Sequence, residues 1–144
     1  MATLKLTVQE DLTIGGVQRG STKVTDYSAI TQADTRLMEV GTAEVSVFKL
    51  NTSVGSGQFK TSDLVYARIS NNSDTGGPNV TVRVLGTGEE YFFVLEPGDI
   101  HIFSNAQMDA NATGSQAFST ANIAEVKAVS SSGTATIELL VASS

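Results

Sequence analysis

Apolar and polar residues alternate with a period of two along much of this chain. Consecutive side chains of a β-strand point to opposite faces of a sheet, so this alternation predicts strands with one buried face. Many of the apolar positions are valine or isoleucine, whose branched side chains suit a pleated sheet. The clearest examples are Leu4–Val8, Val45–Val47, Val65–Ile69, Val80–Val84 and Ala135–Leu139.

Two segments depart from this alternation. Tyr91–Leu95 is apolar at every position, which predicts a short central strand covered on both faces. Ile137–Ala142 also loses its alternation towards the end. A C-terminal strand with two apolar faces needs extra cover, which another subunit could supply.

Turn-forming residues separate the expected strands at intervals of roughly 8–15 residues, a spacing typical of a sandwich or barrel. Gly and Asn supply the positive φ that tight turns need, and Pro presets φ. The turns are expected at Gly15–Gly16, Gly55–Gly57, Asn71–Asn79, Gly86–Gly88, Pro97–Gly98 and Ser130–Gly133. We therefore predict one all-β domain over residues 1–144, an antiparallel, jelly-roll-like β-sandwich of about eight to ten strands.

Little helix is expected. Thr31–Val40 could form a short helical turn, although it lacks a sustained 3.6-residue period. Asn105–Ile123 is polar and rich in small residues, and we predict a long loop that crosses the top of the sandwich. Such loops are often functional. This one is either a plain surface crossover or a segment that orders against a partner.

Composition narrows the classes of partner. Charged residues make up 17% of the chain and the net charge is −6. Nucleic-acid binding depends on clustered cations, and the nine Lys and Arg residues are scattered singly, so no nucleic-acid partner is expected. The absence of cysteine excludes disulfides and thiolate chemistry. No apolar run approaches the ~20 residues that span a bilayer, and the N-terminus lacks a signal-peptide arrangement. Neither a membrane partner nor secretory export is expected.

The only histidine, His101, lies in "EPGDIHIFSN", whose spacing partly matches metal-binding cupin enzymes. Pro97 directly precedes Gly98 where that pattern needs a gap, and no second histidine is available. A catalytic zinc typically takes three protein ligands. We therefore predict no metal here, and a strand on which His101 faces away from Ile100 and Ile102, half exposed or at an interface. A metalloenzyme centred on His101 is the alternative.

Other chemistry finds equally little support. No "GxSxG" nucleophile turn is present, and Glu89 and Glu90 are adjacent, so their carboxylates would face opposite ways on a strand. "GSGQFK" lacks the ending of a phosphate-binding loop. Asn71, Asn72 and Asp74 could ligate calcium, but such residues are ordinary in turns. No catalytic residue, cofactor, metal or small-molecule substrate is predicted.

A resemblance gives the sequence its most specific functional indication. The segments that carry it are Val65–Ile69, Asn71–Asp74, Val80–Val84, Gly86–Gly88, Tyr91–Leu95 with Pro97–Gly98, and Ile100–Phe103. In this order, over about forty residues between Leu64 and Asn105, the pattern resembles small β-sandwich virion proteins of tailed bacteriophages. The resemblance implies a module without enzymatic activity that is present in many copies on the particle, after synthesis in the host cytoplasm.

From this resemblance we predict a capsid decoration, or cement, protein that binds the major capsid protein on the outer head shell and forms a homotrimer. The alternative is a tail- or fibre-associated module that could bind carbohydrate. The terminal strands are the predicted interfaces with neighbouring copies. Their candidate residues are Leu4, Leu6 and Val8 at the N-terminus and Ile137, Leu139 and Val141 at the C-terminus.

Overall fold

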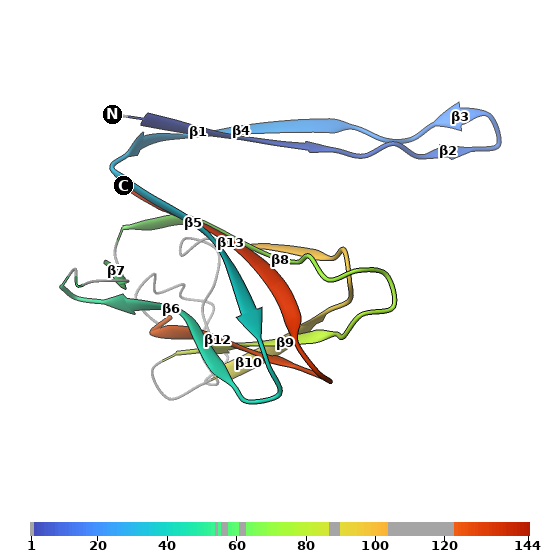
Figure 1. The fold of residues 1–144 in the computed structure, drawn as a ribbon. Coiled ribbons are helices and arrows are strands. Elements are labelled where there is room, and N and C mark those ends of the chain that lie inside the picture. The colour runs from blue at the N-terminus through green and yellow to red at the C-terminus, as the bar shows by residue number, and fades with distance from the viewer. Residues whose placement is uncertain (1, 54, 56–57, 61–62, 87–89, 104–122) are drawn as a thin grey trace.

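A computed structural model describes residues 2–53, 55, 58–60, 63–86, 90–103 and 123–144, which form an all-β protein. This described part contains thirteen strands and no helix, so none of it could cross a membrane as a helix. The strands are β1 (Ala2–Gln9), β2 (Thr13–Ile14), β3 (Val17–Gln18), β4 (Thr22–Ile30), β5 (Gln32–Val40), β6 (Val45–Asn51), β7 (Gln58–Lys60), β8 (Leu64–Asn71), β9 (Val80–Leu85), β10 (Glu90–Leu95), β11 (Ile100–Phe103), β12 (Glu125–Ser130) and β13 (Ala135–Ser143). Figure 1 shows a two-layered β-sandwich and a long hairpin that projects beyond it.

Two packed sheets form the sandwich, which confirms the predicted β-sandwich class. We call them sheet I, with the strand order β11-β8-β13-β5, and sheet II, with the order β10-β9-β12-β6-β7. All pairings are antiparallel except that of β6 with the short strand β7. Four of the pairings are nested in sequence, each enclosing the next, as in one long hairpin folded over on itself. From the outermost to the innermost they are β5–β13, β6–β12, β8–β11 and β9–β10.

The core lies between the two sheets and follows the alternation of the sequence. The side chains of Val80, Val82 and Val84 on β9 are fully buried, while those of Thr81 and Arg83 are only partly buried. Phe48 is also buried in this core, with its ring 6.1 Å from that of Phe103. The period-two pattern therefore identifies the inward face of these strands correctly.

The N-terminal arm, residues 2–30, is a single antiparallel hairpin. β1 pairs with β4 from Leu4 opposite Tyr27 to Gln9 opposite Thr22, and the same register continues to Ile14 opposite Val17. Gly15 and Gly16 make the two-residue turn, and their φ values of 59° and 78° suit glycine.

A bulge in β4 joins the arm to the sandwich. The register shifts between Ala2 and Leu4, so that β4 carries one residue more than β1 at this point. Ala29 adopts a φ of 61° there, a backbone conformation that is uncommon for residues other than glycine. Such a bulge bends a strand, and here it directs the chain from the arm into β5.

The structure corrects two predictions about strand position. Tyr91–Leu95 forms most of β10, an edge strand that pairs only with β9 in the described part of the chain, not a central strand. Its outward residues Phe92 and Val94 are 56% and 55% exposed. Gln32–Val40, where a helical turn was considered, is strand β5, because it pairs with β13 along its whole length. The loop predicted at Asn105–Ile123 lies, except for Ile123, outside the described residues.

Candidate protein interaction surface

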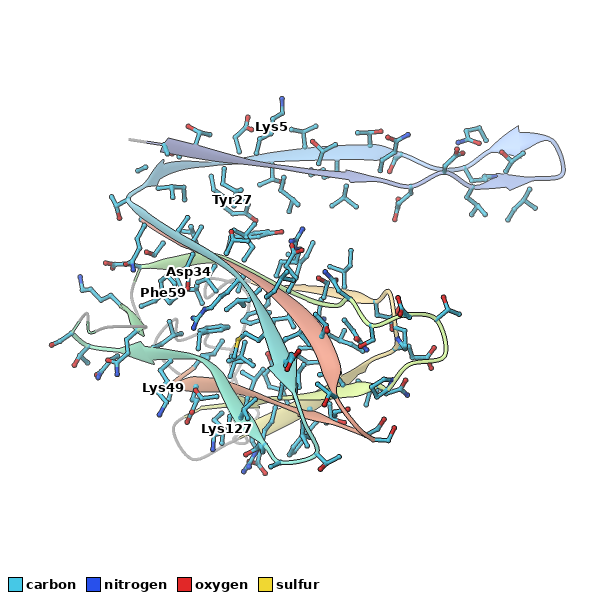
Figure 2. The ribbon with its side chains drawn as sticks, viewed as in Figure 1. Lys5, Tyr27, Asp34, Lys49, Phe59 and Lys127 are labelled. Atoms are coloured by element: carbon cyan, nitrogen blue, oxygen red, sulfur yellow. The ribbon has the colours of Figure 1, made fainter. Side chains whose placement is uncertain are left out.

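The arm has one apolar face and one polar face. Residues directly opposite each other in an antiparallel pair share a face, so the register sorts the arm's side chains into two rows. One row also contains Thr25, Lys23, Ser21, Arg19 and Glu10. Its apolar residues, which we call the arm stripe, are Leu4, Leu6, Val8, Leu12, Ile14, Val17 and Tyr27. The other row is polar except for Val24, and at the tip Thr13 and Gln18 are hydrogen-bonded at 2.7 Å. Figure 2 shows Tyr27 pointing towards the sandwich and Lys5 pointing away from it.

The base of the arm stripe packs against the chain's own sandwich. Leu4, Leu6 and Tyr27 contact a small cluster on the outer face of sheet I that includes the buried Tyr66 and Ala142. The Tyr27 and Tyr66 rings lie 6.0 Å apart. This contact supplies the extra cover that the sequence predicted over the C-terminal strand, and within the described residues the cover comes from the same chain.

The distal part of the arm stripe has no such cover within the described chain. Leu12, Ile14 and Val17 are 50%, 60% and 51% exposed, and Val8 is 43% exposed. Among the described strands, each arm strand also pairs only with the other, so both outer edges of the ribbon carry backbone groups to which no described strand is paired. An isolated two-stranded hairpin is marginally stable in water. The tip is therefore the part of the described molecule that would gain most from a partner.

The predicted interface residues divide into two groups. Leu4 and Leu6 are half-buried at the arm base and Val8 is exposed beyond it, so all three belong to the arm stripe. The side chains of Ile137, Leu139 and Val141 are fully buried in the sandwich core, so they form no part of the surface of this chain. The backbone of β13 cannot pair with a neighbour either, since β5 and β8 flank it on both sides.

The sequence did not single out two other parts of this surface. Leu12, Ile14 and Val17 were missed, although their alternation around Gly15–Gly16 is the signal of a tight hairpin. The outer face of sheet I was missed as well. Ile100, Ile102 and Leu37 are 58%, 40% and 68% exposed on it. They flank a central ion pair between Arg68 and Glu138.

The outer face of sheet II differs, because ion pairs cover it. The cations are Arg83, Lys127 and Lys49, and the carboxylates are Glu44, Glu90 and Glu125. Arg83 is central: its Nε donates to Glu90 at 2.6 Å and its Nη1 lies 3.4 Å from Glu44. Such exposed pairs each stabilise the fold by only ~0–1 kcal/mol, but they leave the face electrically balanced and suited to water.

His101 lies on β11 and faces away from Ile100 and Ile102, as predicted, and its side chain is on the inward face of the strand. Its ring is half-buried among aromatic side chains, with its centroid 3.9 Å from that of Phe93 and 5.8 Å from that of Phe103. Burial lowers the pKa of His101, because the apolar surroundings disfavour the charged imidazolium. Within the described residues, no group of three or more His, Asp or Glu side chains could hold a metal ion.

A surface hollow of about 350 Å³ lies at the turn where calcium was considered. Its lining consists of Asn72, Ser73, Asp74, Gly77, Pro78, Thr134 and Thr136. This lining contains one carboxylate and no aromatic ring, so it offers neither a charged calcium cage nor a stacking platform for a sugar. The neighbouring Asn71 is fully buried and structural, donating at 3.0 Å to the carbonyl oxygens of Pro78 and Leu95.

Comparison with known proteins adds no relative to this picture. No protein-family model matches the chain, and no curated protein is significantly similar to it in sequence. The two apolar surfaces described above are therefore the features that point to a function.

Proposed function

We propose that this protein is a virion structural protein of a tailed bacteriophage, a decoration protein that binds the assembled head shell through its arm. The observation that carries the proposal is the distal arm stripe, which projects beyond the sandwich with Leu12, Ile14 and Val17 half or more exposed (Figure 1). Exposed apolar surface of this kind, backed by a polar face, is typical of a protein–protein contact.

The strand topology supports this proposal. A jelly roll of eight strands in two sheets, an architecture that many viral capsid domains share, would have nested pairs of the kind formed by β5–β13, β6–β12, β8–β11 and β9–β10. Lectin domains and cupins also use it, and a fold alone does not determine a function. The arm distinguishes between these uses, because it presents apolar surface to a macromolecule while the hollow at Asp74 has no sugar platform.

A decoration protein needs no reaction chemistry, only surface that binds the assembled shell more tightly than its free subunits. Binding to one state alone stabilises that state by mass action. A ribbon with two free edges and one apolar face can add to a sheet on a neighbour while burying its stripe. The rigid sandwich then fixes where the arm begins.

The test is a shortened arm. Residues 11–20 are deleted and Glu10 is joined to Ser21 by Asn-Gly, a two-residue turn that this hydrogen-bonded pair accepts. The arm base and the sandwich keep their contacts, so the melting temperature should stay unchanged while binding to undecorated capsids is lost. The matched control keeps the length of the arm and replaces Thr7 on its polar face by Ser. Full binding by the shortened protein would contradict the proposal.

Quantifying this protein in purified virions separates the head from the tail. A copy number comparable to that of the major capsid protein is expected for a head decoration protein. A far smaller copy number would place the module on the tail, which is the alternative reading of the same resemblance.

A further inference from the structure

We propose that the distal arm stripe of one copy docks on the uncovered outer face of sheet I of a second copy of this chain. The donor surface is Leu12, Ile14 and Val17, and the acceptor surface is Ile100 and Ile102 on β11 with Leu37 on β5. This inference names a self-contact of the free protein. On a head shell, the shell and the second copy would compete for the same stripe.

The chain itself contains the template for this contact. At the arm base, Leu4, Leu6 and Tyr27 of the stripe already pack on the outer face of sheet I, against Tyr66 and Ala142. Both surfaces continue past the point where this contact ends. The stripe runs on to Leu12, Ile14 and Val17, and the sheet face runs on to Ile100, Ile102 and Leu37. A second copy therefore offers the stripe the surface chemistry it already binds at its base.

The acceptor face has the layout of a binding surface. Ile100, Ser70, Glu138 and Leu37 lie in one row across the four strands of sheet I. The apolar side chains stand on the two edge strands, and the Arg68–Glu138 ion pair fills the middle. By contrast, the exposed large apolar residues on the described outer face of sheet II, Phe92 and Val94, stand on a single edge strand, β10.

The charges on the two surfaces are opposite in sign. By register, the stripe side of the distal arm carries two cations, Arg19 and Lys23, and one carboxylate, Glu10. The outer face of sheet I carries Arg68 together with two carboxylates, Glu138 and Glu39. Docking one on the other pairs a net positive surface with a net negative one, which favours this orientation over arm-to-arm stacking.

Symmetry allows every copy to satisfy both surfaces. Each chain offers one stripe and one acceptor face, so a two-fold dimer exchanges two arms, and a closed ring such as the predicted trimer passes each arm to the next copy. Either arrangement leaves no stripe uncovered.

The first test measures self-association of the full-length protein by sedimentation over a range of concentrations. Ile14→Asp in the donor and Ile100→Asp in the acceptor should each weaken the association about tenfold or more, as central interface residues do. Two matched controls should leave it unchanged. Thr13→Asp lies beside Ile14 but on the polar face of the arm. Val94→Asp lies on β10, an edge strand of sheet II, and Val94 has nearly the same exposure as Ile100.

The second test locates the contact and does not depend on a loss of binding. The chain has no cysteine, so Ile14→Cys and Ile102→Cys proteins can be mixed and oxidised. A disulfide-linked heterodimer should form readily from this pair, and far more slowly when Thr13→Cys replaces the donor or Val94→Cys replaces the acceptor.

Each outcome decides the matter. A protein that is monomeric at every concentration, or equal cross-linking by the control pairs, overturns the self-contact. A monomer that still binds capsids through its arm leaves the proposed function intact. Self-association without any capsid binding supports the inference and contradicts the proposed function.

Discussion

The sandwich and the arm are built from the same alternating sequence pattern, yet they use it in opposite ways. In the sandwich, two sheets face each other, so the apolar rows of β9 and β13 are removed from water completely. The arm is a two-stranded ribbon, and within the described residues its stripe packs on a second layer only at the base, around Tyr27 and Tyr66. Alternation thus predicts which side chains favour burial, whereas the topology determines whether the same chain buries them.

The largest expected effect contrasts the two regions directly. Ile137→Ala opens a cavity in the fully buried core and should cost ~2–5 kcal/mol of unfolding free energy. Ile14→Ala at the exposed arm tip should change it by no more than ~0.5 kcal/mol. Urea unfolding of dilute protein measures both values, and a comparable loss from Ile14→Ala would mean that the arm is part of the cooperative fold.

The joint between arm and sandwich should have an intermediate effect. Tyr66 is buried beneath the arm base. Tyr66→Ala should lower the unfolding free energy by ~1.5–3 kcal/mol, because the apolar burial of the ring is lost. The loosened arm should also be cut faster by trypsin at Lys23, while cleavage at Lys127 in β12 stays slow. Tyr66→Phe keeps the ring and should keep the arm docked. Unchanged cleavage in Tyr66→Ala would show that the base contact does not hold the arm.

Loss of the buried hydrogen bonds of Asn71 should have the next largest effect on the unfolding free energy. Asn71→Ala deprives the buried carbonyl oxygens of Pro78 and Leu95 of their donor and should cost ~1–3 kcal/mol. Asn72→Ala, at the exposed neighbouring position, is the matched control and should cost much less. Capsid binding by the folded Asn71→Ala protein should be normal, because this anchor stabilises the sandwich and does not touch the arm.

The smallest expected effect is a pH dependence of the unfolding free energy, which arises in the sandwich and not in the arm. Burial lowers the pKa of His101 in the folded state below the ~6.5 of the unfolded chain. At low pH the folded protein therefore binds fewer protons than the unfolded chain. The contribution of His101 to the unfolding free energy is complete above pH ~6.5 and is lost as the pH falls through the folded-state pKa. His101→Gln should reduce the fall in unfolding free energy between pH 7 and pH 5. An identical pH profile in that variant would rule out His101 as its source.

The sequence predicts the fold class and the inward faces well, because both depend on local alternation. It misplaces Tyr91–Leu95 as a central strand, since strand order depends on pairing between residues far apart in the chain. For the same reason it assigns Ile137, Leu139 and Val141 to an interface, although non-local partners bury them. Leu4–Val8 was recognised as a strand, but its pattern is the same in a sheet and in a projecting arm. Symmetric alternation about Gly15–Gly16 was the available clue to the hairpin.

We propose that the arm tip, unlike the sandwich, is completed only by a partner. Amide hydrogen exchange, followed residue by residue as protein concentration rises, tests it most directly. Protection should increase together at Leu12–Val17 of the arm tip and at Ile100–Phe103 of β11, while β9 and β12 exchange slowly and equally throughout. Arm-tip amides that exchange at the same fast rate in dilute protein, in concentrated protein and on capsids would contradict the account.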